Sequence, residues 1–506
     1  MSIKELITEE GLINGDIVQT TERIEENNSV SIPMKFISNK EYHDGWINID
    51  NAFTGVLALG ASSSERIYYI IEPIMEQLAA KGFSMMVYDY KFPTLAVKLY
   101  YNYCINKKAG KTPEGCSFNI INFSEVEYSH CVNPIQEKYF SDDLNYLTAA
   151  QAFVRSLGIS WNTDNNIHIP PYYKGLMEHM VAACMNFFVN YKEGKYSDLP
   201  HVLSFFKLPT EEIIEILKKS KLSNEIIQHI SDISDTERKK DIYKTISILR
   251  RLISRIPTKE NYWILRKDGD DIDLYISDPK NPSYLLIAND PEKQDKITPL
   301  VSTIIHTIEE QTISNFLKNK PTAFVIDNIE SVYLPHIDRN LCCGREENAS
   351  MIIGSTNLHE IKNTYGNEET DFIQSVAKNV LSTLVKDEET INYLTKDVLG
   401  KKANQEQKRY DFLVEPEEIK NMPHDWIVGS TSRDFFLTEK ENNYFCKVGT
   451  EYKEKEKKQM DFKSLPKYHT FKNEEEKETL LTENYTKITR EVEGLYQEIF
   501  NKNSTN

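Results

Sequence analysis

The chain has 506 residues, of which 40% are hydrophobic and 11% aromatic, so it can bury a large core and does not have the composition of a disordered protein. Its 60 Lys and Arg against 77 Asp and Glu give a net charge of −17, which argues against a surface that attracts nucleic acid as a whole. The seven cysteines show no CxxC pair and no zinc-ligand spacing, which predicts neither a disulfide framework nor a zinc site.

Residues 1–44 are polar and acidic, and we expect them to form a polar leader without a signal peptide or a membrane span. The most apolar long window, Leu176–Val189, is broken by Glu178, His179 and Asn186. These features predict a cytoplasmic protein.

Residues 45–142 have the pattern of a parallel α/β unit. A short apolar run at 55–59 ends in Gly60, an amphipathic stretch follows at 66–80, and a second apolar run at 84–88 ends in Asp89. Only a helical crossover of this length returns the chain parallel to its first strand. A third strand is predicted at 118–122.

The periodicity turns helical over residues 143–256, which predicts an all-α domain inserted into the sheet domain. Strand signals resume over residues 257–449, which we interpret as the second half of the sheet domain. The predicted strands there are 262–265, 273–276, 284–288, 323–326, 351–353, 380–385 and 426–428, and a helix is predicted at 300–317.

Residues 450–506 begin with a run of mixed charge at 451–458 and end in a predicted helix near 475–500. A charge run of this kind is typical of a solvated tail, and a helix that docks on a partner is the alternative. We therefore predict a charged helical tail.

The position after the first strand is where a phosphate-binding P-loop, Gly-x-x-x-x-Gly-Lys-[Ser/Thr], belongs. The residues there are Gly60-Ala61-Ser62-Ser63-Ser64-Glu65-Arg66-Ile67, in which only the first defining glycine survives. Glu65 places a carboxylate where phosphates would lie, and Ile67 offers no hydroxyl to magnesium. Gly60, Ser64 and Arg66 are the candidate remnants of a nucleotide site, and the alternative is a plain serine-rich turn.

Two longer segments resemble the TraG/TraD-like coupling proteins of type IV secretion and conjugation. They are Gly45-Trp46-Ile47-Asn48-Ile49, before the first strand, and Lys81–Pro93, which contains Tyr88-Asp89-Tyr90-Lys91-Phe92-Pro93. The resemblance covers roughly residues 45–430. It implies a RecA-like P-loop NTPase fold split by an inserted all-α domain, in agreement with the α/β pattern above.

Against that family's pattern the catalytic positions are altered. Asp327 could hold magnesium, but Asn328 stands where the family has the glutamate that activates water, and Thr356 stands at the position of the sensor glutamine. The resemblance makes Arg345 a candidate arginine finger, and a surface ion pair is the alternative reading.

We therefore expect a catalytically degenerate, coupling-protein-like adaptor that recruits a substrate or machine component, with no cofactor. The resemblance leaves open a type IV or a type VI apparatus, peripheral recruitment to the inner membrane and a homo-oligomer. The alternative is an atypical ATPase that uses ATP and magnesium through Arg66 and Asp327. Basic pairs at 239–240 and 250–251 lie among acidic neighbours, so we do not expect nucleic acid to be a tight direct partner.

Overall fold

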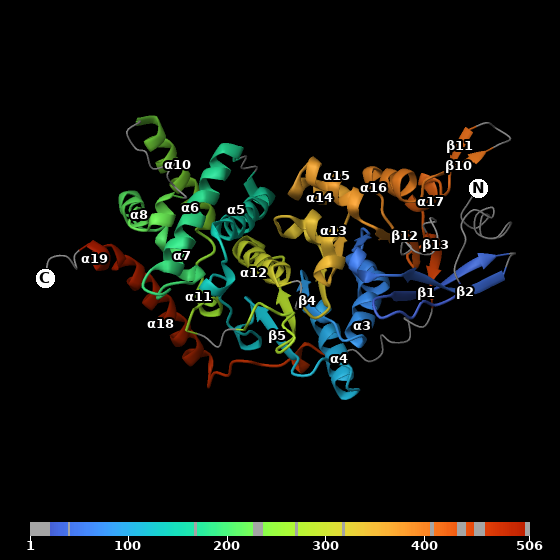
Figure 1. Ribbon diagram of the computed structural model, residues 1–506, viewed down its shortest axis with the longest axis horizontal. Helices are drawn as coiled ribbons and strands as arrows, with labels where there is room; N and C mark the ends of the chain where they lie inside the picture. The colour runs from blue at the N-terminus through green and yellow to red at the C-terminus, as the bar shows by residue number, and fades with distance from the viewer. Residues whose placement is uncertain are drawn as a thin grey trace.

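One large sheet organises the molecule (Figure 1). The computed structural model describes residues 21–38, 41–165, 169–225, 236–268, 272–315, 319–404, 409–432, 442–449 and 461–500. Within these residues, an 11-stranded sheet has the order β2-β1-β13-β12-β9-β3-β8-β7-β4-β6-β5. From β9 to β5 neighbouring strands run parallel, and β12, β13, β1 and β2 extend the sheet with antiparallel pairs. The strands are β1 (Val30–Ser38), β2 (Glu41–Ile49), β3 (Val56–Leu59), β4 (Ser84–Asp89), β5 (Ser117–Asn122), β6 (Ser283–Ala288), β7 (Thr322–Ile326), β8 (Ala349–Ser355), β9 (Asn379–Ser382), β12 (Trp426–Thr431) and β13 (Asn442–Val448).

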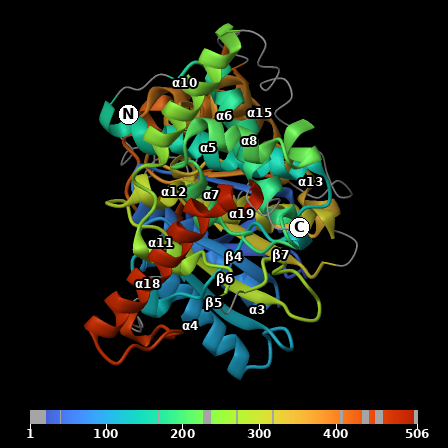
Figure 2. The same cartoon turned by 90° about the vertical axis from the view of Figure 1, so that its left-hand side faces the viewer.

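The central strands are buried on both faces, as a parallel sheet between helices requires. In β3, Leu57 and Leu59 pack into the core on one face, and Val56 and Ala58 pack into the core on the other. Figure 2 shows α12 on one side of the sheet and α3 and α4 on the other. The helices of this region are α2 (Ser63–Arg66), α3 (Glu72–Ala80), α4 (Thr94–Lys108), α12 (Gln294–Ser314), α13 (Ile337–Glu347), α14 (Leu358–Tyr365), α15 (Asn367–Val376), α16 (Glu388–Tyr393) and α17 (Pro416–Lys420).

A helical lobe interrupts the sheet between β5 and β6, where the sequence predicts the all-α insertion (Figure 1). Its helices are α5 (Asp143–Asn165), α6 (Pro171–Asn190), α7 (Leu199–Phe205), α8 (Thr210–Leu217), α10 (Thr236–Ile253) and α11 (Lys259–Ile264). Helix α5 packs on α12, so the lobe and the sheet share one apolar cluster.

Two local predictions are wrong. The predicted strand at 262–265 belongs to α11, because the Thr258 side chain accepts a hydrogen bond from the Asn261 N–H and caps a helix there. The predicted strand at 273–276 is an irregular segment, in which the Leu274 N–H donates to the Tyr139 hydroxyl rather than to a neighbouring strand.

The polar leader assigned to residues 1–44 includes sheet structure. Strand β1 lies between β2 and β13, with Val30, Ile32 and Met34 buried. Its alternating buried residues are typical of a strand with one covered face, a signal that the polar flanking residues obscured.

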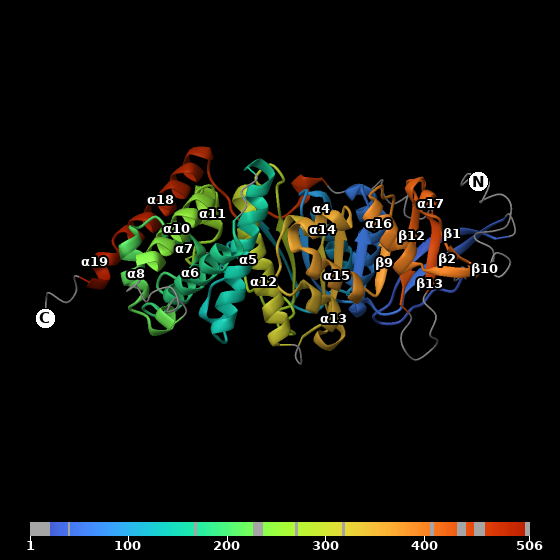
Figure 3. The same cartoon turned by 90° about the horizontal axis from the view of Figure 1, so that it is seen from above.

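The C-terminal segment is docked on the rest of the chain. Helices α18 (Glu474–Glu493) and α19 (Leu495–Phe500) lie along the helical lobe (Figure 3), where α18 contacts α7 and α11. The expectation of a solvated tail is therefore wrong for this helix, while the charged run at 451–458 lies outside the described residues. Among the described helices, none is long and apolar enough to cross a membrane.

Candidate nucleotide site

The residues singled out in the sequence meet at the carboxyl ends of β3, β7 and β8. These strands are neighbours in the parallel part of the sheet. Ligands of open α/β sheets bind at this edge, because strand ends and helix N-termini converge there. Gly60 follows β3, Asp327 follows β7, and Thr356 follows β8.

The segment after β3 is a tight turn rather than a wide loop. Helix α2 begins at Ser63, and the Ser62 hydroxyl caps it by accepting a hydrogen bond from the Glu65 N–H at 3.4 Å. The Gly60 and Ala61 N–H groups donate to backbone carbonyls of Ser355 and Leu384. A phosphate cradle needs several main-chain N–H groups around an open loop, and these two are committed elsewhere.

Gly60 is the residue that lets this turn pack closely. A Cβ atom at Gly60 would lie 2.0 Å from the Thr383 hydroxyl oxygen. Thr383 therefore fills space that a wider loop would need.

Arg66 is fully buried at 0% exposure and points inward. Its Nε and Nη2 atoms lie 2.7 and 2.6 Å from Asp327 Oδ1. Its Nη1 atom donates to the Gly60 carbonyl at 2.6 Å, and Nη2 also donates to Asn328 Oδ1 at 3.2 Å. The guanidinium thus joins the turn after β3 to the end of β7.

Asp327 is occupied by groups of its own chain. One carboxylate oxygen accepts from Arg66, and the other accepts from the Ser63 hydroxyl at 3.0 Å. Gly354 makes room for this pair, since a Cβ atom there would lie 2.3 Å from Asp327 Oδ1. A magnesium ion at Asp327 would have to displace the cation and the hydroxyl that already bind it.

Asn328, the residue after Asp327, is hydrogen-bonded to a further acidic residue of the site. Asn328 adopts the left-handed conformation, with φ of 58°, and its Nδ2 donates to Glu330 Oε1 at 3.2 Å. The same oxygen accepts from the Thr356 N–H and from the Thr356 hydroxyl at 2.9 Å. Glu330 therefore ties the altered glutamate position to the altered sensor position.

The sequence reasoning missed Glu330 and Ser63. Glu330 lies in the short helical turn Ile329–Ser331, and its distance from Asp327 fits no family motif. Ser63, rather than the predicted Ser64, reaches the site, while Ser64 is exposed. An acidic residue four positions after the end of β7 was the one available signal for Glu330.

Glu65 faces away from Arg66. Its Oε1 atom lies 2.7 Å from Nδ1 of the exposed His424, which precedes β12. Arg345 lies on α13, and its side chain is outside the described atoms, so the arginine finger remains a prediction.

Asp89, at the end of β4, is a second buried acid at this edge. Its Oδ2 accepts from the Leu95 and Ala96 N–H groups at 2.9 Å and caps α4. Burial raises the pKa of Asp89 to about 7, and the charge of Asp327 adds to the effect. Asp89 is therefore engaged in capping α4.

Part of the chain is similar to a known protein family. A family model described as the type IV secretion-system coupling protein DNA-binding domain matches residues 207–422. Over these residues the chain is similar to the type IV coupling proteins. The description of that domain bears against the expectation that nucleic acid is not a direct partner. No curated protein matches the sequence significantly.

Solved coupling-protein structures confirm the RecA-like α/β fold with a helical domain. Unbound bacterial conjugative coupling protein TrwBdeltaN70 has a TM-score of 0.56 at 13% identity, over 79% of this chain and 86% of that chain. Plasmid coupling protein TrwB bound to the GTP analogue GDPNP has a TM-score of 0.58 at 12% identity, over 86% and 97%. TrwB bound to ADP and Mg²⁺ has a TM-score of 0.54 at 13% identity, over 76% and 83%.

Proposed function

We propose that this protein is a coupling-protein relative that no longer turns over ATP and works as an adaptor of a secretion or conjugation apparatus. The observation that carries the proposal is the buried Arg66, which binds Asp327, Asn328 and the Gly60 carbonyl together. The nucleotide site of the fold is closed by the chain's own side chains.

Reopening this site would be costly. Taking one partner from a buried ion pair costs about 3–5 kcal/mol, because the other charge stays buried without compensation. ATP would also require residues 63–65 to leave the first turn of α2. A cost of that size lowers affinity by about two to four orders of magnitude.

Equilibrium binding of a fluorescent ATP analogue with magnesium tests the proposal. We expect no saturable binding to the wild type at micromolar concentrations. We expect Glu65→Gly/Arg66→Lys/Ile67→Thr to raise affinity at least tenfold, since it removes the guanidinium and restores the loop chemistry. No rise in that variant, once circular dichroism shows that it is folded, would show that the loop is not what excludes the nucleotide.

The rival function is an atypical ATPase, and Glu330 is the observation that favours it. Its carboxylate lies beside Asn328 and Thr356, where an activating base would be needed. Micromolar ATP affinity, with phosphate release abolished by Asp327→Ala and reduced by Glu330→Gln, would establish the ATPase and overturn the adaptor. Asp371→Ala, an exposed acid on α15, is the matched control.

The adaptor would hold its cargo through the helical lobe, and we propose a protein as that cargo. The name of the matched domain makes DNA the competing ligand. Arg250 belongs to one of the two basic pairs noted in the sequence. Its guanidinium already donates to the carbonyls of Phe206 and Leu208. Filter binding of single-stranded DNA at two salt concentrations distinguishes a protein cargo from DNA. Submicromolar affinity that falls steeply with salt would show that the ligand is DNA.

We also propose that the adaptor works in the cytoplasm, peripheral to the membrane, and that it does not need nucleotide to set its oligomeric state. Size-exclusion chromatography with light scattering should give one mass with and without ATP and magnesium. A mass that rises only with ATP would contradict this.

A further inference from the structure

The C-terminal arm, residues 461–500, reaches from the sheet to the helical lobe (Figures 1 and 2). At its start, the Phe462 ring packs against Phe92 and Tyr128, with centroids 5.5 and 4.5 Å apart. Further along, the Tyr468 hydroxyl donates to the Phe118 carbonyl at 2.8 Å. These contacts hold the arm against the β5 side of the sheet and direct α18 onto the lobe.

Helices α18 and α19 bury one narrow apolar stripe. The aliphatic residues at its centre are 0–3% exposed and recur at intervals of seven, four and three, which puts them on one helix face: Leu481, Ile488, Val492 and Leu495. The surface that receives them is formed by α7, α11 and α8. We call this surface the lobe groove.

The rim of the lobe groove is basic where the arm is acidic. Glu478 pairs with Lys259, and Glu498 pairs with Lys192. Glu498 Oε2 also accepts from the Tyr196 hydroxyl at 3.0 Å. One pair has the opposite sense, since Lys487 of the arm pairs with Asp268 of the lobe at 2.8 Å, and together these pairs match the arm to the groove in charge.

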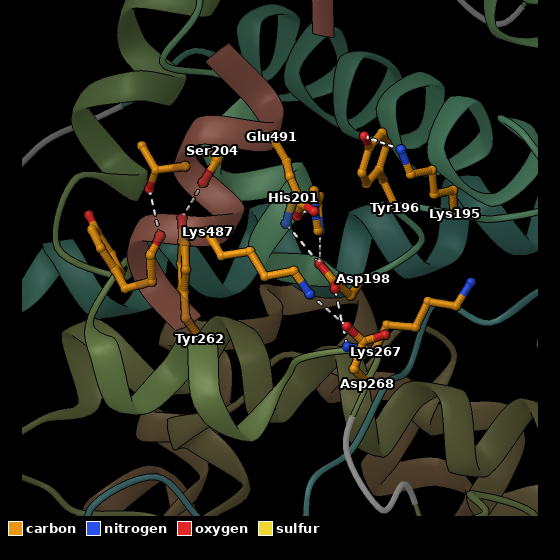
Figure 4. A network of polar contacts seen from close by, with 12 residues as sticks. Lys195, Tyr196, Asp198, His201, Ser204, Tyr262, Lys267, Asp268, Lys487 and Glu491 are labelled. Carbon is orange, nitrogen blue, oxygen red and sulfur yellow. Dashed lines mark hydrogen bonds and ion pairs between the residues drawn. The ribbon is translucent and has the colours of Figure 1, made fainter. Parts of the chain in front are cut away.

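The best-buried polar contact is made by His201, which Figure 4 shows between the lobe and the arm. His201 is 5% exposed; its Nδ1 lies 2.6 Å from Asp198 Oδ1, and its Nε2 lies 3.3 Å from Glu491 Oε2. Asp198 caps α7 through the His201 N–H, so the lobe fixes the imidazole and leaves one ring nitrogen for a carboxylate from outside. In this structure that carboxylate is Glu491.

A surface cleft borders the contact between the arm and the lobe groove. A cavity of about 290 Å³ lies beside Val492, lined from the lobe by Ser204, Leu208 and Pro209. This cleft is partly open to solvent and is lined also by Lys207 and Glu212 of the lobe and by Thr489 and Glu493 of the arm, so it lies at the edge of the interface.

We propose that the lobe groove is the adaptor's docking site for an acidic amphipathic helix of a partner protein, and that the C-terminal arm is a resident competitor for it. The inference rests on the proposed adaptor function. An apolar stripe laid in a groove with charged rims is a common mode of helix recognition. Aromatic contacts such as that of Tyr485 with Tyr262 add to the aliphatic stripe, and the ion pairs of the arm are partly exposed, so release of the arm would be a local opening that leaves the core folded.

The test uses the full chain and a fluorescent peptide of residues 473–500. In wild type the arm occupies the groove, so binding should be weak. In Ile488→Asp/Val492→Asp, which releases the arm and leaves the groove unchanged, we expect at least tenfold tighter binding. Adding His201→Ala should remove at least half of that gain in binding free energy, because it deletes the partner of Glu491.

The matched control is Thr479→Asp/Leu480→Asp, which adds the same charges to exposed positions of α18 and should bind like wild type. Equal peptide affinity in wild type and the released variant would overturn the proposal. Displacement of the peptide by an equimolar oligonucleotide would also overturn it, in favour of nucleic acid. A dimer that the arm substitutions dissociate would show that the arm serves a second copy instead.

Hydrogen exchange of the wild type gives a readout that does not depend on a variant folding. We expect amides of α18 to exchange faster than those of α12, because the arm opens separately from the core. Equally slow exchange would overturn the proposal. Neither measurement involves ATP, so their failure is distinguishable from failure of the adaptor assignment.

Discussion

Replacing Arg66 with alanine should destabilise the protein strongly. Arg66 is fully buried, Asp327 is 2% exposed, and the substitution leaves Asp327 with the Ser63 hydroxyl as its remaining side-chain donor. The Gly60 carbonyl and Asn328 Oδ1 each lose a donor as well. Breaking a buried pair from one side costs about 3–5 kcal/mol, and we expect a loss in that range.

Urea unfolding followed by tryptophan fluorescence measures this loss. Asp327→Asn alone should cost a similar amount, and the double variant should cost less than the sum by about 2 kcal/mol or more, because the two residues share one interaction. Arg490→Ala, an exposed arginine on α18, is the control and should change stability by about 0.5 kcal/mol or less.

Two results would refute the reasoning. A cost below about 1 kcal/mol for Arg66→Ala would mean that the guanidinium is not a buried, committed partner. Additive costs in the double variant would mean that Arg66 and Asp327 do not act as a pair.

Three further predictions test the surrounding structure. Gly354→Ala should destabilise by about 1–3 kcal/mol in the same assay, because its methyl group would lie 2.3 Å from Asp327 Oδ1, whereas Gly158→Ala, with open space at its Cβ, should not destabilise. Burial alone would lower the pKa of His201, but Asp198 and Glu491 raise it to about 9. The stabilisation from His201 is therefore complete below its unfolded pKa of about 6.5 and should be lost as pH rises through 9, a change of up to about 3 kcal/mol that His201→Gln should abolish. Phe462→Ala should speed hydrogen exchange over residues 461–472 and leave the exchange of β4 unchanged, because the ring holds only the start of the arm.

Much of the fold could be predicted because the central strands and helices have clear periodicity. The run before Gly60 and the run before Asp327 are continuous apolar segments, as expected of parallel strands buried on both faces. The predicted strand at 262–265 failed because a short apolar run fits a strand or a helix equally well, and the capping side chain of Thr258 decides in favour of the helix.

The sequence predicted which residues lie at the site, but it did not predict how their side chains are arranged. Gly60, Arg66, Asp327, Asn328 and Thr356 do come together, since each follows a strand of the same sheet edge. The sequence did not show that Arg66 points inward, because that depends on where α2 begins. The role of His201 was also hidden, since its second carboxylate comes from a helix 290 residues further along the chain.

The start of α2 at Ser63 explains why the loop has residues that differ from a P-loop. Ile67 is 4% exposed and packs in the core below the sheet, where the hydroxyl of a magnesium-binding threonine would need a partner. Arg66 supplies several donors in one plane and satisfies Asp327, Asn328 and a carbonyl, which a single ammonium group would not reach together. Each substitution that removes a contact to nucleotide therefore adds a contact within the chain. The contacts of Arg66 support the proposed scaffold, while Glu65 Oε2, Glu330 Oε2 and Thr383 Oγ1 are buried at this edge without a hydrogen-bond partner among the described residues.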